Sequence, residues 1–515
     1  MKRRILSMLL AAVMLLSLAA CGSENAGGGT ATADPLTKDD VISIAVISEA
    51  SWPYNDNWKV MEYIREGVGA TVEVTAIPAS DASTKHSLMF ANPEGLPDLV
   101  HFDVGHAGNH WAIQGAAVSF DSLAEYMPNL QKWIKSLSDE DYDKYITPRK
   151  AYDGDIYYSP AYGRQTTDGV RAWLYRKDIF DKHNLETPKT FDELYDVCLK
   201  LKELYPSSYP FGIRAGLGTT LLTMAPSFDE YWQFGIYYDY DEEKFRFGPT
   251  EDTMLEVIAF YQKMLAAELI SPDFITINTN SWQELVTTDR SFIMPEYQTR
   301  IDFFNSLARQ NNPDFKLSAM VPPVANTENG ASKVSLCSLD NNGVIICNTG
   351  DERRIANAAK YLDWFYADEN VELVSWGKEG ETFEVVNGKK QYIVPEGTDE
   401  QIKSLYGFSM PTTFFRADVE AFEATESQDI QETRDMVLEH TMDRQNPVVP
   451  LSPEENKTAA DINTEINTFK KEMITKLILG LEPMSKFDEF KETIEGMNIQ
   501  TLLEIYETAY SRVKK

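Results

Sequence analysis

The sequence predicts an α/β protein built on a mostly parallel sheet that helices cover on both faces. From residue 41 onward, short β-rich runs alternate with helical stretches. Strands are expected at 41–47, 71–77 and 98–102, and helices near 56–67, 82–92 and 107–115. Strands interleaved with helices of this length indicate β-α-β units. In such sheets ligands bind at the carboxyl ends of the strands, where Trp52, Tyr54 and Asp103 stand in this chain.

The rest of the chain is richer in helices. Thr190 and Glu193 have the spacing of a capping box, which predicts a helix that runs to about Leu204. Further helices are expected over 251–267 and 352–366. The turn-forming residues 340–343 precede an apolar run and predict a strand that reaches Cys347.

The N-terminal segment has the three parts of an export signal. Lys2, Arg3 and Arg4 precede an apolar run over 5–18, which is too short for the usual membrane span. The residues Leu18-Ala19-Ala20-Cys21 resemble the lipobox of bacterial lipoproteins, in which the cysteine receives a lipid. We therefore expect a signal peptide at 1–20, a lipid on Cys21 and a flexible, Gly-rich tether at 21–35. The alternative is an ordinary signal peptide with an incidental cysteine.

Charge and cysteine content narrow the classes of partner. The chain has a formal net charge of -32, which loss of the signal peptide makes more negative. Such a charge repels phosphate backbones, so nucleic acid is not an expected partner. Cys198, Cys337 and Cys347 show no metal-binding spacing. A bridge between Cys337 and Cys347 and small buried thiols are both open, and we favour the thiols.

Four blocks of the mature chain, at 174–194, 268–274, 358–383 and 487–512, together resemble the solute-binding lipoproteins of carbohydrate ABC importers, in the large Gram-positive branch of family 1. The block 174–194 is similar to the family's "YRKD" and "P-x-T-[FW]-[DE]-E-L" signature, and 268–274 to its "GLIdPdF" helix exit. Residues 358–383 resemble "LDWlY…yGiEGvhy", and 487–512 the closing helices. The chain departs from this pattern at Asn184 and Asn498, where Gly is common, and at Phe487, where Trp is usual.

The resemblance implies a periplasmic-binding-protein-like fold of type II, with two lobes joined by a hinge. Lobe 1 is expected to hold 36–160 and a returning piece at 293–340, and lobe 2 to hold 161–292 and 341–515. Chain crossings near 158–160, 294–296 and 342–344 would form the hinge.

A sugar site needs aromatic plates and planar hydrogen-bonding groups, because sugars have apolar C–H faces and many hydroxyls. Residues of these types stand at the expected strand ends and loops. The candidates are Trp52, Tyr54, Asp103, Tyr162, Arg164, Trp232, Trp282, Tyr297, Arg300 and Trp376. For each aromatic taken singly, core or lobe-surface packing is the favoured interpretation; together they favour a cleft.

Two other classes of protein remain as alternatives. His101, Asp103, His106 and His110 could form a metal site, although Gly105 and Gly108 weaken the helix that would hold it and no zincin glutamate follows His106. A polysaccharide-active enzyme is the other, but no nucleophile elbow or phosphate-binding loop is present, and 239–243 lacks the glycine of a calcium loop.

We therefore expect a monomeric binding protein without catalytic residues, cofactor or metal. It would capture an oligosaccharide outside the cell, close around it, and deliver it to the permease subunits of an ABC transporter. A peptide or another polar solute such as a polyamine is the alternative ligand.

Overall fold

The computed structural model describes residues 34–92, 95–104, 109–112, 114–163, 170–214, 216–335, 341–395, 401–413, 415–444 and 446–513. The expected signal peptide, Cys21 and almost all of the tether lie outside the described residues. Arg164, His106 and Cys337 lie outside them too. Residues Leu36–Lys515 form one compact unit, within which two sheets organise two lobes.

The sheet of lobe 1 confirms the predicted parallel arrangement. Its strands are β1 (Val41–Ser48), β2 (Thr71–Pro78), β3 (Leu99–Val104) and β9 (Asn341–Ile346), in the order β2-β1-β3-β9. Strand β1 runs parallel to both β2 and β3, with Ile44 opposite Val74 and Leu99. The edge strand β9 is antiparallel to β3 and places Ile345 opposite Val100.

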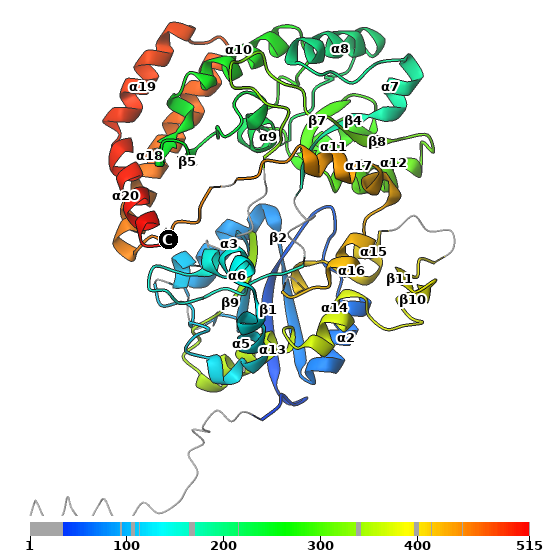
Figure 1. The fold of residues 1–515 in the computed structure, drawn as a ribbon, viewed down its shortest axis with the longest axis vertical. Coiled ribbons are helices and arrows are strands. Elements are labelled where there is room, and N and C mark those ends of the chain that lie inside the picture. Colours follow the sequence, from blue (N-terminus) through cyan, green and yellow to red (C-terminus); the bar gives the residue numbers. More distant parts are fainter. Residues whose placement is uncertain are drawn as a thin grey trace, which may run out of the picture. The chain divides into compact units, whose positions relative to one another are not determined.

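Helices cover both faces of this sheet, as the buried residues of β1 show. Ile42, Ile44 and Val46 belong to one core, whereas Ala45 and Ile47 belong to another. Since successive strand residues point to opposite faces, the two cores lie on the two sides. The first core takes in α2 (Lys59–Val68), α5 (Pro128–Ser136) and α13 (Glu352–Trp364), and the second takes in α3 (Ala82–Phe90). Figure 1 shows these helices around the strands.

Shorter elements complete lobe 1. They are α6 (Asp139–Tyr145), α14 (Asp368–Ser375), the hairpin of β10 (Phe383–Val386) and β11 (Lys389–Tyr392), α15 (Ile402–Tyr406) and α16 (Val419–Ala424).

Lobe 2 has an antiparallel sheet, and it corrects the expected lobe boundaries. Strands β7 (Ile293–Tyr297), β4 (Arg171–Arg176) and β8 (Leu317–Met320) pair in the order β7-β4-β8. The assignment of 293–340 to lobe 1 is therefore wrong, because β7 and β8 both pair with β4 in lobe 2. The assignment of all of 341–515 to lobe 2 is wrong as well, because β9 pairs with β3 and the residues up to Phe415 pack in the core of lobe 1.

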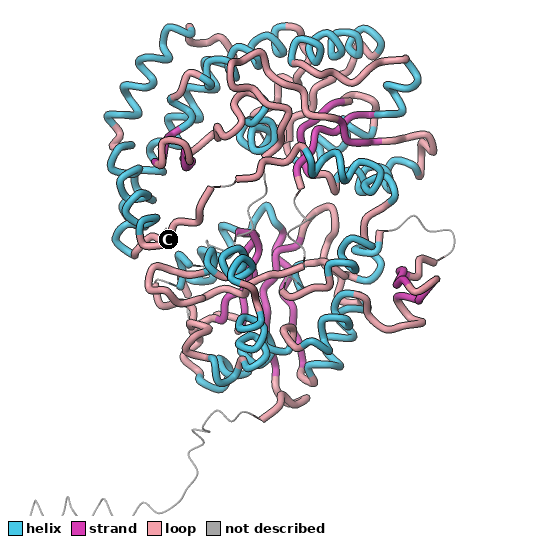
Figure 2. Tube along the Cα trace, in the orientation of Figure 1, coloured by secondary structure: helices cyan, strands magenta, loops and turns pink. Residues whose placement is uncertain are grey.

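Most of lobe 2 is helical (Figure 2), and the helices predicted after Thr190, over 251–267 and within 487–512 are present. Thr190 caps α8 (Phe191–Leu204) through its side chain, which accepts from the N–H of Glu193, while the Glu193 carboxylate accepts from the Lys189 N–H. The reciprocal capping box occurs instead at Ser452 and Glu455. The helices are α7 (Lys177–His183), α8 (Phe191–Leu204), α9 (Leu217–Met224), α10 (Thr253–Ala266), α11 (Thr279–Thr287), α12 (Arg300–Arg309), α17 (Gln428–Glu439), α18 (Pro453–Ile478), α19 (Phe487–Gly496) and α20 (Ile499–Ser511), with a hairpin of β5 (Ile236–Asp239) and β6 (Lys244–Phe247).

The chain passes between the lobes at three places. Two of them, between 163 and 170 and between 335 and 341, include residues outside the described ranges, and the third is the short link between α16 and α17. The predicted crossing at 294–296 is wrong, since these residues lie inside β7. The segments near 158–160 and 342–344 instead lie against each other in lobe 1, where the Ser159 N–H donates to the Val344 carbonyl at 2.9 Å.

Asn184 and Asn498 do fit the places where glycine is common in the family. Both adopt the left-handed backbone region, with φ of 50° and 64°. Asparagine tolerates this region better than other residues with a Cβ, so the departures preserve the turn geometry.

Candidate ligand-binding site

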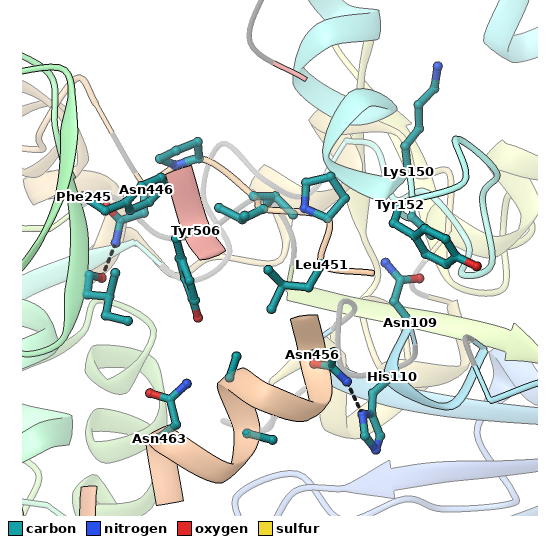
Figure 3. Close-up of a pocket in the computed structure, with 18 residues that line it drawn as sticks. Asn109, His110, Lys150, Tyr152, Phe245, Asn446, Leu451, Asn456, Asn463 and Tyr506 are labelled. Carbon is teal, nitrogen blue, oxygen red and sulfur yellow. Dashed lines mark hydrogen bonds between the residues drawn. The ribbon is translucent and has the colours of Figure 1, made fainter. Parts of the chain in front are cut away.

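A cavity of about 510 Å³ is lined by residues of both lobes (Figure 3). Lobe 1 contributes the segments 109–110 and 150–152, and lobe 2 contributes the loop 446–451 and one face of α18. The lining residues are Asn109, His110, Lys150, Ala151, Tyr152, Ile236, Phe245, Asn446, Pro447, Val448, Val449, Pro450, Leu451, Asn456, Ala459, Ala460, Asn463 and Tyr506.

The α18 face is set by helical spacing. Asn456, Ala459, Ala460 and Asn463 stand at i, i+3, i+4 and i+7, so they share one side of the helix. The two alanines are small and leave room between the two amides. The wall therefore combines two amides with two small apolar side chains, of which Ala459 is buried in the core of lobe 2.

One amide in the cavity bridges the lobes. The Nδ2 of Asn456 lies 2.7 Å from Nδ1 of His110, and Figure 3 shows the two side chains meeting. The other ring nitrogen, Nε2, lies 3.0 Å from Nε2 of Gln114. Burial lowers the pKa of His110, which favours a neutral imidazole, whose one unprotonated nitrogen can accept from one of these two amides.

Two further amides differ in their hydrogen bonds: Asn446 makes several, and Asn109 has an oxygen that can still accept one. Asn446 donates to Gln233 and to the Ile236 carbonyl, and accepts from the Tyr238 N–H at 2.9 Å. The Oδ1 of Asn109 is buried and accepts no hydrogen bond from the described residues. The cavity thus combines fixed and free amides with the rings of Tyr152, Phe245 and Tyr506.

A second group of side chains, the arginine cluster, joins the lobes elsewhere. It consists of Arg214, Glu296 and Arg300 in lobe 2, with Ser51 and Trp52 of lobe 1 against it. The Arg300 guanidinium donates to Ser51 Oγ at 2.9 Å. Its carbon lies 5.8 Å from the Trp52 ring, whose Nε1 donates to Gln401 at 2.6 Å.

Glu296 is the anionic centre of the arginine cluster. It is 2 % exposed, and its carboxylate meets Arg214 Nε at 2.6 Å and Arg300 Nε at 3.4 Å. Burial alone would raise the pKa of Glu296, but the two guanidiniums outweigh it and lower that pKa below its ordinary value. The carboxylate is therefore ionised at neutral pH.

Tyr297 stands beside this cluster at the end of β7. Its hydroxyl accepts from Arg171 at 2.9 Å, and the Arg171 guanidinium carbon lies 3.7 Å from the ring centre. The ring is only half-buried, so a hydrogen bond and a cation–π contact fix the orientation of an accessible aromatic plate.

Comparison with known proteins shows the family. The sequence profile of the bacterial extracellular solute-binding proteins matches residues 58–372, which is more than half of the chain. The chain belongs to this family. Lipoprotein LipO of Bacillus subtilis (strain 168) is 22 % identical over 405 residues, which cover 75 % of each chain.

Solved structures of solute-binding proteins share the fold. The alginate-binding protein AlgQ2 matches with a TM-score of 0.71 at 19 % identity, over 92 % of this chain and 98 % of its own. The S. pneumoniae ABC-transporter substrate-binding protein FusA, in complex with kestose, matches with a TM-score of 0.71 at 18 % identity, over 92 % and 99 %. The predicted fold class, periplasmic-binding-protein-like with two lobes, is confirmed. No helix in the described part of this solute-binding protein is long and apolar enough to cross a membrane.

Four of the predicted site residues meet in this solute-binding protein. Trp52, Trp282 and Tyr297 all lie near the guanidiniums of the arginine cluster, to which Arg300 itself belongs. Trp282 is fully buried beneath Arg214 and Arg300, with each guanidinium carbon 5.8 Å from its ring. It therefore supports the arginines and does not face a ligand.

Other predicted aromatics pack in cores, which corrects their expected place in the cleft. Trp232 is 1 % exposed and donates to the Gly248 carbonyl at 3.0 Å. Trp376 is 2 % exposed, donates to Asp418 at 3.2 Å and packs on Tyr392. Tyr162 packs edge-on against Trp133 and Tyr145.

The remaining candidates are less informative. Tyr54 is half-buried, donates to Asp56 at 2.7 Å and packs edge-on against Trp58, so its hydroxyl is already engaged. Asp103 lies in β3 at the predicted strand end. Arg164 lies outside the described residues.

The alternative metal site gains no support from the described residues, among which no group of three His, Cys, Asp or Glu side chains could hold an ion. His101 is buried, with its Nδ1 3.4 Å from the Ile47 N–H, and His110 faces two amides. Cys198 and Cys347 are buried free thiols, so the alternative bridge from Cys347 is wrong.

The sequence reasoning missed most of the cavity. Asn446, Asn456, Asn463 and Tyr506 were not candidates, and neither was Arg214. The helical spacing of Asn456 and Asn463 was a usable signal, and so was the proline-flanked loop 446–451. These residues contact 109–110 and 150–152 only in the folded chain, so local sequence pattern could not predict that they share a cavity.

Proposed function

We propose that this solute-binding protein captures an extracellular oligosaccharide and delivers it to the permease subunits of an ABC transporter. The observation that carries the proposal is the cavity of about 510 Å³ whose amide and aromatic lining comes from both lobes. The family itself serves solute transport, and no catalytic residue is part of the proposal.

The lining suits a sugar for physical reasons. Tyr152 and Tyr506 offer ring faces for C–H surfaces, and the asparagine amides can both donate to and accept from hydroxyls. A ligand that contacts both walls favours whichever arrangement of the lobes brings them together. Ligand binding thereby becomes a change of shape that a permease can recognise.

The names of structural neighbours are consistent with this ligand class. FusA is described in complex with kestose, AlgQ2 as alginate-binding, and a Bifidobacterium longum infantis protein as HMO-binding. These matches share 15–19 % identity with the chain, so they support the fold directly and the ligand class only by analogy.

A thermal-shift screen of glycans and peptides tests the proposal. A ligand at 100 times its dissociation constant adds about 2.7 kcal/mol of stability, which is readily measured. Tyr152→Ala and Asn456→Ala should weaken the glycan response, and Tyr126→Ala, outside the cavity in lobe 1, should not. A response to peptides alone would contradict the sugar assignment, and shortening of the glycans would contradict a binding-only role.

We also propose that a lipid on Cys21 holds the protein at the outer face of the cell membrane, with 21–35 as a flexible tether. The lipobox-like residues before Cys21 support this, as does the relative named Lipoprotein LipO. Mass spectrometry of the N-terminal peptide should find a diacylglyceryl cysteine, and Cys21→Ser should release the protein into the medium. An unmodified Cys21 in the membrane fraction would contradict the anchor.

A further inference from the structure

We propose that the ligand carries a carboxylate, as an acidic oligosaccharide does, and that Arg214 and Arg300 bind this group. This inference rests on the proposed function and specifies its ligand class, and it places the acidic sugar unit at the arginine cluster, apart from the units that the cavity would hold. The arginine cluster has the charge, the open donors and the neighbouring aromatic surface that such a ligand needs.

The first argument is the charge balance. Within the described residues, the only ion-pair partner of Arg214 and of Arg300 is the same carboxylate, Glu296. Two guanidiniums therefore share one negative charge, in a chain whose overall net charge is -32. A local excess of positive charge at low exposure is stabilised by an added anion, since nearby water is too scarce to screen it.

The second argument is the unused hydrogen-bonding capacity of Arg214. It contacts Glu296 through Nε, and its terminal nitrogens donate no hydrogen bond to the described residues. Its side chain keeps 16 % exposure, so the fork is partly accessible. A guanidinium fork matches a carboxylate in a bidentate, charge-assisted pair.

The third argument is the surface beside the fork. The half-buried Tyr297 ring lies 6.0 Å from the Arg214 guanidinium carbon, and the Trp52 ring lies 5.8 Å from that of Arg300. A pyranose ring could stack on either plate while its carboxylate reaches the arginines. Arg300 also donates to Ser51 of lobe 1, so an anion bound here would lie beside a contact that joins the lobes.

The test compares matched acidic and neutral ligands by calorimetry. Trimers of galacturonate, glucuronate and mannuronate are titrated beside their methyl esters, which keep the ring and hydroxyls but lose the charge. We expect at least one acid to bind 10-fold or more tightly than its ester. Arg214→Gln should weaken that acid about 10-fold and change the ester less than 2-fold, whereas Arg290→Gln, in the same lobe, should change neither.

A simple probe separates the anion site from the identity of the glycan. Glucuronate at millimolar concentration should raise the melting temperature of the wild type more than glucose does, and Arg214→Gln should abolish that difference. Equal binding of acids and esters, or binding of neutral glycans only, would overturn the carboxylate inference and leave the proposed function intact. Failure of every glycan in both screens would overturn the proposed function and this inference with it.

Discussion

Replacing Glu296 by glutamine should destabilise lobe 2 by about 3 kcal/mol, the low end of the cost of breaking a buried ion pair. Glu296 gives one oxygen to Arg214 at 2.6 Å, and the other accepts from the Tyr297 N–H at 3.0 Å and faces Arg300 at 3.4 Å. Glutamine supplies one acceptor in place of two. Whichever way its amide turns, an NH₂ group faces a donor, and Arg300, only 8 % exposed, loses its neutralising charge.

Urea denaturation followed by tryptophan fluorescence measures this cost, since Trp282 lies 5.8 Å from both guanidiniums. Asp181→Asn is the matched control, because it breaks the exposed pair with Lys177 and should cost less than about 0.5 kcal/mol. The double variant Glu296→Gln, Arg300→Met should be no less stable than Glu296→Gln alone, since it removes the uncompensated charge. If Glu296→Gln lowered the free energy of unfolding no more than Asp181→Asn does, the ion pair with Glu296 would not be what stabilises the buried charge of Arg300.

The same pair predicts a pH dependence. The pKa of Glu296 is lowered in the folded protein, so its contribution to stability is present above the unfolded value of about 4.3 and is lost as pH falls through the folded value. The stability difference between the wild type and Glu296→Gln should therefore shrink below about pH 4. A difference that grew on acidification would contradict the assignment of charge.

Three further outcomes are expected. Trp52→Ala should weaken binding of the identified glycan about 3- to 10-fold in calorimetry, because one aromatic plate is lost. Burial lowers the pKa of His86 to about 4, so on acidification the unfolded chain takes up a proton before the folded protein does. The free energy of unfolding should therefore fall as pH drops from about 6.5 toward 4. Urea titrations at pH 7 and pH 5 should show a loss of up to about 2 kcal/mol, and this loss should be absent in His86→Phe. Gly343→Ala should destabilise lobe 1 by about 1–3 kcal/mol in urea, because its Cβ would meet Tyr158 at 2.5 Å, whereas Gly235→Ala, with open space around it, should cost less.

Local pattern predicted the first sheet but not the second. Strands β1, β2 and β3 follow one another with helices between them, so alternation of short apolar runs and helices was enough to identify them. Strand β7 has Pro295 at its centre, and a proline there argues against a strand when only the sequence is considered. It is an edge strand of the order β7-β4-β8, where a missing N–H is tolerated, and its pairing with β4 spans more than a hundred residues. No local signal carries that pairing.

The site was predictable where chemistry and chain position agreed. Trp52 stands four residues after the end of β1 and Tyr297 ends β7, and both lie beside the arginine cluster. The prediction that Trp232 faces the cleft was wrong because its indole N–H donates to the Gly248 carbonyl inside the core. The close approach needs a glycine, since a Cβ at 248 would lie 2.7 Å from the Trp232 Nε1. Burial of an aromatic ring depends on such partners, which composition and spacing do not reveal.

The contacts that join the lobes set the energy scale on which a ligand acts. Arg300 donates to Ser51 at 2.9 Å, and Asn456 meets His110 at 2.7 Å. A neutral hydrogen bond of this kind contributes about 0.5–1.5 kcal/mol, and one from a charged donor about 1.5–3 kcal/mol. Together these two contacts contribute a few kcal/mol to the equilibrium between this arrangement of the lobes and others. A ligand shifts that equilibrium only by its difference in affinity for the two arrangements, and moving it from 1:99 to 99:1 needs about 5.5 kcal/mol. A carboxylate on Arg214 and a sugar ring on Trp52, both next to the Ser51 contact, would supply much of that difference at the place where the lobes already touch.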